Sequence, residues 1–379
     1  MSKKSLGSAS ATSSQDAAFG AMLGAFVGDC VGAVLEFNDK NNNPETVDRA
    51  LTVPGGGVWG VGPGQITDDS ELALALASGL SQGEPTEGFP AEHVAQSYGA
   101  WLNSHPFDVG NTCRTAFSAA THHDPSSGPL APIMRKQAQF SKDSQSNGAL
   151  MRCTPLAVWG ARLTDDQLAA AAMEDCRLSH PHVVTQHASA VYLIAVRNLI
   201  ERPGDVEGAV AAAKGWAAQH ACAEVMEWLT DALGTAPGPA ANRMIGFVKY
   251  GFFYAFRHLH LRTPFRTALR ETLLLKGDTD TNAAIVCGML GALYGASGIP
   301  PEMAGPVLGR HGQPDQKGPK RPGWLQPGRL PAVFAQLYGK ATGEPVDLHS
   351  LAGVPAADAA HEEAALAAEA AEVDAALRV

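Results

Sequence analysis

Hydrophobic residues along most of the chain follow the spacing of helices rather than that of strands. Between Asp16 and Gly339 the sequence is rich in Ala, Leu and Gly, and β-branched runs that alternate with polar residues are few. This pattern predicts an all-α fold, a single compact multi-helix domain. The predicted helices are 16–37, 68–82, 90–103, 110–122, 148–160, 164–178, 185–201, 205–219, 221–233, 242–259, 265–275 and 280–296.

Segments rich in Gly, Pro and Asn separate the predicted helices. We expect loops or extended segments at 41–45, 54–65, 180–184 and 302–331. The predicted domain covers 16–345, between a flexible N-terminal tail at 1–15 and an Ala/Glu-rich tail or helix at 346–379. The sequence has no internal repeat of fixed period, which argues against a helical solenoid.

The first predicted helix carries a glycine at every fourth position: Gly20, Gly24, Gly28 and Gly32. This spacing removes side chains from one slowly drifting face, so a second backbone can approach closely. The stretch lacks the G-x-G-x-x-G order that follows a strand in dinucleotide-binding folds. Tight helix packing is therefore the better interpretation of these glycines.

Two acidic clusters stand directly before hydrophobic runs, Thr-Asp-Asp-Ser-Glu at 67–71 and Gly-Asp-Thr-Asp-Thr-Asn at 277–282. Either one alone is typical of helix capping, because Thr and Asp accept hydrogen bonds from free amides at a helix start. Together they offer four carboxylates and two threonine hydroxyls, with no His or Cys among them. These hard oxygen donors favour Mg²⁺ or Mn²⁺ over zinc.

Such a donor set is suited to a pair of cations. Two ions about 3.5–4 Å apart can clamp an oxygen-rich substrate and activate water. Because carboxylates in a partly buried site repel one another until cations neutralise them, we expect metal binding to stabilise the fold.

Composition and charge argue against several classes of protein. The hydrophobic content of 45% is normal for a globular protein, and no apolar run reaches the roughly 20 residues that span a bilayer. The formal charge is −10 and the basic residues form no run, which argues against nucleic acid as a partner. The six cysteines lie far apart, and residues 1–15 lack the apolar segment of a secretory signal. We therefore expect a soluble, cytoplasmic, monomeric protein with reduced cysteines and no membrane partner.

Five segments resemble the signature blocks of the ADP-ribosylglycohydrolase family, and they occur in the family's order. They are GAFVGDCVGAVLEF (24–37), GQITDDSELALA (64–75), HPFDVGNTCR (105–114), SNGALMRCTPLA (146–157) and GDTDTNAAIVCGMLGALYG (277–295). The stretches GGGVWGVGPGQITDD (55–69) and PFDVGNTCR (106–114) are especially similar to the arginine-directed bacterial branch, whose members activate dinitrogenase reductase. The resemblance implies a single all-α domain with a binuclear metal centre at the base of a cleft. It further implies a mono-ADP-ribosylated protein as substrate and ADP-ribose as product.

The resemblance also implies roles for individual residues. Glu36 and Asp69 are the implied catalytic residues, and Asp108 would face the guanidinium of the substrate arginine. Metal ligation is implied for Thr67, Asp68, Asp69, Asp278, Asp280 and Thr281. Substrate contacts are implied for Asp108, Gly110, Ser146, Asn147, Gly148, Met151 and His180. The chain departs from the branch at Asn111, where another aspartate is common, and at Ser70, where Thr is commoner.

Other interpretations of the acidic clusters remain. An isoprenoid synthase needs an Asp-Asp-x-x-Asp motif, but the third acidic position is Leu72 here, so we set that class aside. The alternatives that stay open are hydrolysis of ADP-ribosyl-serine or O-acetyl-ADP-ribose, and a non-catalytic relative that binds ADP-ribose.

Overall fold

A computed structural model describes residues 12–313 and 316–351, and this part of the chain is helical, as predicted. Its β-structure consists of two isolated bridges. The helices are α1 (Ser14–Gly32), α2 (Pro44–Ala50), α3 (Asp68–Leu80), α4 (Ala91–Asn103), α5 (Asn111–Phe117), α6 (Leu130–Ala138), α7 (Thr154–Trp159), α8 (Asp165–Arg177), α9 (Val183–Glu201), α10 (Val206–His220), α11 (Ala223–Leu233), α12 (Val248–His260), α13 (Phe265–Leu274), α14 (Thr279–Tyr294), α15 (Pro301–Leu308) and α16 (Leu330–Thr342).

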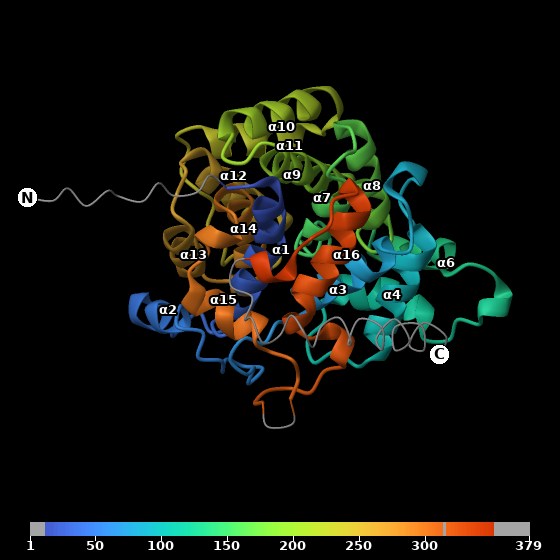
Figure 1. Ribbon diagram of the computed structural model, residues 1–379, viewed down its shortest axis with the longest axis horizontal. Coiled ribbons are helices and arrows are strands. Elements are labelled where there is room, and N and C mark those ends of the chain that lie inside the picture. Colours follow the sequence, from blue (N-terminus) through green and yellow to red (C-terminus); the bar gives the residue numbers. More distant parts are fainter. Residues whose placement is uncertain (1–11, 314–315, 352–379) are drawn as a thin grey trace, which may run out of the picture.

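A buried antiparallel pair, α1 and α14, forms the centre of the fold (Figure 1). A Cβ added at Gly24 would lie 2.2 Å from Cys287 O, and one added at Gly28 would lie 2.3 Å from Ala283 O. Only glycine permits this approach of two backbones, so the packing role predicted for the glycine face is confirmed. At the end of the pair, Gly32 lies against the backbone of Asp280. The end of α1 and the start of α14 are therefore held together.

The other helices surround this pair. α9 packs on both α1 and α14, and α8 and α10 cover α9, whereas α12 and α13 pack on α14 (Figure 1). On another side, α3, α7 and α16 contact α1, and the rings of Phe19 and Phe334 lie 5.1 Å apart. α3 consequently begins beside the junction of α1 and α14, which brings both acidic clusters to one place.

Four predicted helices are clearly shorter than expected, and one of them is 110–122, where α5 ends at Phe117. α1 ends at Gly32, and a turn over 33–37 carries Glu36 and gives Phe37 a positive φ of 56°. Glu36 therefore does not continue the glycine face, as the predicted helix 16–37 implied. The helices predicted at 148–160 and 242–259 begin at Thr154 and Val248. The residues just before 148 pair instead with the early part of the second predicted helix, because Asn147 N donates to Gly246 O and Val248 N donates to Gln145 O.

Four helices were not predicted: α2, α6, α15 and α16. The expected loop at 41–45 instead starts α2, because Asn43 caps its first amides and Pro44 occupies its first turn. The extended segment expected at 302–331 is also partly wrong. α15 ends at Leu308 and α16 starts at Leu330, which leaves a shorter irregular connection between them.

The remaining expectations concern the two tails, the cysteines and membrane-spanning helices. Residues 1–11 and 352–379, most of the two predicted tails, lie outside the described residues. All six cysteines are free, and each except the half-buried Cys222 is buried. Within the described ranges, every helix falls short of the length and apolar character that a membrane crossing requires.

Candidate active site

A cavity of about 380 Å³ opens where the end of α1 and the starts of α3 and α14 meet. All seven residues predicted to contact substrate line it: Asp108, Gly110, Ser146, Asn147, Gly148, Met151 and His180. They come from the loop before α5, the segment before α7 and the connection between α8 and α9. The sequence motifs therefore converge in space, although they are far apart along the chain.

The predicted metal ligands lie at the floor of this cavity. Asp68, Asp278, Asp280 and Thr281 line it. Thr67 and Asp69 lie beneath them and are 0% and 1% exposed. Hydrogen bonds order the group, since Thr67 Oγ1 lies 3.0 Å from Asp69 Oδ2 and Thr281 N donates to Asp280 Oδ1 at 2.9 Å.

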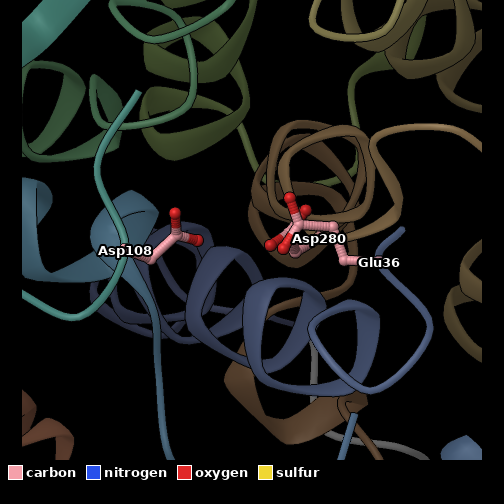
Figure 2. Close-up of side chains that lie close together, drawn as sticks. All are labelled: Glu36, Asp108 and Asp280. Atoms are coloured by element: carbon pink, nitrogen blue, oxygen red, sulfur yellow. The ribbon is translucent and has the colours of Figure 1, made fainter. Parts of the chain in front are cut away.

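Three carboxylates from separate elements converge at one point of the cavity (Figure 2). Oxygens of Glu36, Asp108 and Asp280 all lie within 4.8 Å of one another. Glu36 comes from the turn after α1, Asp108 from the loop before α5, and Asp280 from the first turn of α14. Trp59, in the Gly-rich loop, donates its Nε1 hydrogen to Glu36 Oε2 at 2.8 Å and so fixes this side chain.

The electrostatics of the site disfavour a full set of negative charges. Burial, reinforced by neighbouring carboxylates, raises the pKa of Glu36, Asp68 and Asp108 to about 8 each. The same causes hold the pKa of Asp69 and Asp280 well above the usual range. Among the described residues that line the cavity, none is Lys or Arg. Protonation or a bound cation would therefore neutralise this cluster.

The donor set fits a hard divalent cation. Carboxylate and hydroxyl oxygens supply every predicted ligand atom, as Mg²⁺ and Mn²⁺ prefer. Asp69 Oδ1 is buried and has no hydrogen-bond partner among the described residues. A buried carboxylate oxygen left unpaired is costly, and a bound cation would satisfy it.

The wall opposite the acidic floor is built from hydroxyl, amide and imidazole groups. His180 Nε2 lies 2.9 Å from Ser146 Oγ, and its Nδ1 lies 2.8 Å from Ser179 Oγ. Burial, with the charge of Arg152 as a second cause, holds the pKa of His180 well below its usual range, so the ring is neutral. Asn147 Nδ2 donates to Asp278 Oδ2 at 2.7 Å and joins this wall to the floor.

Arg152 lies outside the cavity and contacts the backbone of this wall. The guanidinium is fully buried, pairs with Asp175 at 3.2 Å and donates to Gly148 O at 3.0 Å. It also lies over the Tyr98 ring, 4.6 Å from the centroid. The turn that contains Gly148 is thereby held without a helix of its own.

Sequence reasoning missed two residues of this site, Asp29 and Trp59. Asp29 lies behind the cluster in α1 and accepts hydrogen bonds from Thr67 and Ser70. The available signal for Asp29 was a single charge within a helix that is otherwise apolar from Ala17 to Gly32. Trp59 lies in the stretch 55–69 that resembles the bacterial branch, but the resemblance assigned it no role, and an aromatic residue in a Gly-rich loop has many uses.

Comparisons of sequence and structure relate this chain to known proteins. The sequence model of a family described as ADP-ribosylglycohydrolase matches residues 10–321. ADP-ribosyl-[dinitrogen reductase] glycohydrolase of Rhodospirillum rubrum is 28% identical over 290 residues, 75% of this chain and 88% of the relative. ADP-ribosylarginine hydrolase Tri1 of Pseudomonas putida (strain GB-1) is 26% identical, over 76% of this chain and 73% of its own. A solved structure titled ADP-ribosylglycohydrolase-related protein complex matches with a TM-score of 0.65 and 25% identity, over 87% of this chain and 99% of that one.

Proposed function

Because the chain belongs to the ADP-ribosylglycohydrolase family, we propose that it hydrolyses the N-glycosidic bond joining ADP-ribose to an arginine side chain of a modified protein. The observation that carries this proposal is the position of Asp108, whose carboxylate lies within 4.8 Å of Glu36 and Asp280 at the cavity. A carboxylate there can pair with the planar guanidinium next to the bond that breaks. The name of one relative, ADP-ribosylarginine hydrolase, supports the arginine linkage, and that of another, ADP-ribosyl-[dinitrogen reductase] glycohydrolase, supports a modified protein as substrate.

The proposed cofactors are two divalent cations, Mg²⁺ or Mn²⁺. The ligands would be Thr67, Asp68, Asp69, Asp278, Asp280 and Thr281. When bound, the ions supply positive charge that offsets the carboxylates and stabilises negative charge that develops on ribose and water oxygens. The support for this assignment is the all-oxygen donor set and the unpaired Asp69 Oδ1.

The protein side chains would carry the proton and hold the leaving group. With bound cations lowering its pKa, the Glu36 carboxylate, oriented by the Trp59 indole, would take a proton from the attacking water. The water oxygen forms a bond to the ribose C1″ while the C1″–N bond breaks. The electron pair of the C1″–N bond leaves with the guanidine nitrogen, which then takes up the proton that Glu36 received from the water. Asp108 would hold the guanidinium in line. The products are ADP-ribose and the unmodified protein.

The wall of the cavity would bind the nucleotide. The Gly148 amide can donate to a diphosphate, and the neutral His180 ring and Ser146 hydroxyl can hydrogen-bond ribose or phosphate oxygens. Because no Lys or Arg is among the described lining residues, the diphosphate would depend on these groups and on the cations.

The proposal is tested by comparing three substrates: arginine-linked, serine-linked and O-acetyl-linked ADP-ribose. We expect turnover of the arginine linkage, its loss on treatment with EDTA, and its recovery with Mg²⁺ or Mn²⁺. Efficient turnover of the serine linkage alone would refute the choice of substrate. ADP-ribose binding with no turnover of any of the three would instead assign a binding protein.

A further inference from the structure

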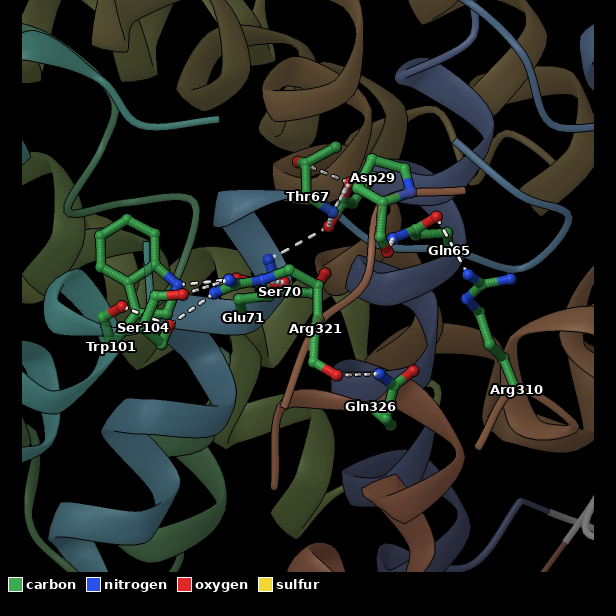
Figure 3. Close-up of polar contacts among 11 residues, drawn as sticks. Asp29, Gln65, Thr67, Ser70, Glu71, Trp101, Ser104, Arg310, Arg321 and Gln326 are labelled. Carbon is green, nitrogen blue, oxygen red and sulfur yellow. Dashed lines mark hydrogen bonds and ion pairs between the residues drawn. The ribbon is translucent and has the colours of Figure 1, made fainter. Parts of the chain in front are cut away.

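Asp29 caps a helix to which it does not belong. It lies in α1 with no exposed surface, and Thr67 N donates to both of its carboxylate oxygens at 3.1 Å. Ser70 N donates to Oδ2, also at 3.1 Å (Figure 3). These amides belong to the start of α3, where the Thr67 side chain makes no capping bond of its own. Asp29 therefore supplies the acceptor that the first turn of α3 needs.

The Thr67 hydroxyl has one hydrogen and two carboxylate acceptors within reach. Asp29 Oδ1 lies 2.8 Å from Thr67 Oγ1, and Asp69 Oδ2 lies 3.0 Å from it. A hydrogen directed at Asp69 would occupy Oδ2, one of the two oxygens of a carboxylate that is proposed to bind a cation. A hydrogen directed at Asp29 leaves lone pairs free on both Thr67 Oγ1 and Asp69 Oδ2, and the shorter distance favours this arrangement.

We propose that Asp29 is a positioning residue that makes Thr67 and Asp69 a cation-binding pair, by capping α3 and by accepting the Thr67 hydroxyl hydrogen. This inference rests on the proposed function, in which both residues hold a cation. Asp29 would not touch the cation but would orient a side chain that does. Removal of such a hydrogen-bond partner of a metal ligand weakens metal affinity about 10–100-fold.

Two buried arginines fix the backbone on either side of this pair (Figure 3). Arg310 Nη2 donates to Gln65 Oε1 at 3.0 Å. Arg321 binds both carboxylate oxygens of Glu71, at 2.7 and 2.8 Å. Because residues 65 and 71 are held independently, removal of the Asp29 charge acts on the Thr67 hydroxyl and not on the path of the whole segment.

The decisive variant is Asp29→Asn, which keeps the shape of the side chain. Its carbonyl oxygen can still accept from the Thr67 and Ser70 amides, while its NH₂ group donates to Thr67 Oγ1. The Thr67 hydrogen then turns to Asp69 Oδ2, so a hydrogen bond takes up one lone pair on Thr67 Oγ1 and one on Asp69 Oδ2 and each binds a cation less well. By calorimetry with Mn²⁺ alone, we expect the dissociation constant to rise about tenfold or more. Asp16→Asn is the matched control, because Asp16 lies at the opposite end of α1, accepts from Ser297 N and Oγ, and should leave Mn²⁺ binding unchanged.

A double-mutant cycle tests the role of the hydroxyl. In a Thr67→Val background there is no hydrogen to direct, so Asp29→Asn should weaken Mn²⁺ binding by less than about threefold further. Equal effects in both backgrounds would overturn the role of the hydroxyl. If Asp29→Asn does not fold, Asp29→Ser provides an uncharged and smaller capping group, and the same loss of affinity is expected of it.

The remaining outcomes separate this inference from the proposed function. If Asp29→Asn binds Mn²⁺ within about twofold of wild type while Asp280→Asn binds it more weakly, the inference is overturned and the proposed cation site stands. If the wild-type protein binds no Mn²⁺, the proposed cation site itself is refuted, and the inference with it.

Discussion

Asp108 is the residue whose substitution tests the substrate most directly. In Asp108→Ala the guanidinium of the substrate would lose its carboxylate partner inside a partly closed cavity. Two unit charges about 4 Å apart interact with about 4 kcal/mol at an effective dielectric constant of 20. Asp108 is partly exposed, and solvent screening reduces this value. We therefore expect a loss of about 2–4 kcal/mol, which is roughly thirtyfold to a thousandfold in kcat/KM.

The assay compares kcat/KM for ADP-ribosyl-arginine and ADP-ribosyl-serine peptides, with the Kd for ADP-ribose measured in parallel. A serine linkage presents no cation, so any activity on it should be nearly unchanged by Asp108→Ala, as should ADP-ribose binding. Asp143→Ala, which removes an exposed carboxylate outside the cavity, is the matched control and should have wild-type kinetics.

An equal loss on both substrates would refute this reasoning. The structure offers a specific alternative for that outcome, because Asp108 lies within 4.8 Å of Glu36 and Asp280 and can serve the cation site instead. In that event Asp108→Ala would also weaken Mn²⁺ binding. If Asp108 acts only on the guanidinium, Mn²⁺ affinity stays at the wild-type value.

Three further predictions concern the cations, the central helices and a buried histidine. Asp280→Asn should weaken Mn²⁺ binding and hydrolysis together by about tenfold or more, and unchanged metal-dependent hydrolysis would contradict its role. Gly24→Ala should destabilise the fold by about 1–3 kcal/mol in urea unfolding, since its Cβ would meet Cys287 O at 2.2 Å; Gly215→Ala, in open space on α10, should not. Burial lowers the pKa of His258 to about 4, with the Arg257 charge as a second cause. Its folded pKa lies below the unfolded value of about 6.5, so stability is complete above that pH and is lost as the pH falls toward 4. Between pH 7 and pH 5 the stability of the wild-type protein relative to that of His258→Gln should fall by about 2 kcal/mol, because the carboxylate cluster titrates equally in both proteins.

The parts of the fold that local sequence patterns encode were predictable. Helix α3 is an example, because the acidic cluster at 67–71 and the hydrophobic run that follows it mark its start within one residue. The glycine face of α1 likewise predicted a close backbone neighbour, although it did not identify that neighbour as α14. Signals of this kind depend on residues within one or two turns.

The parts that depend on distant partners were not predictable. The segment 148–153 has a helical composition, but the turn at Asn147 pairs with Gly246, about a hundred residues away, and Arg152 bonds back to Gly148 O. In the sequence Asp29 is one polar position in an apolar helix, and its role becomes visible only from its hydrogen bond with Thr67 in the folded protein. The same holds for Trp59, whose contact with Glu36 joins two loops.

Helix packing and site geometry are linked through α1 and α14. Glu36 follows the last turn of α1, and Asp278 and Asp280 flank the first residue of α14, so the distance between these carboxylates is set by how closely the two backbones pack. At Gly32 that approach is so close that a Cβ would lie 2.4 Å from Asp280 Cα. A wider spacing at Gly24 or Gly28 would separate Glu36 from Asp280 as well as loosen the core. The glycines thus contribute to cation binding without touching a cation, and the Gly24→Ala protein should bind Mn²⁺ more weakly even at temperatures where it remains folded.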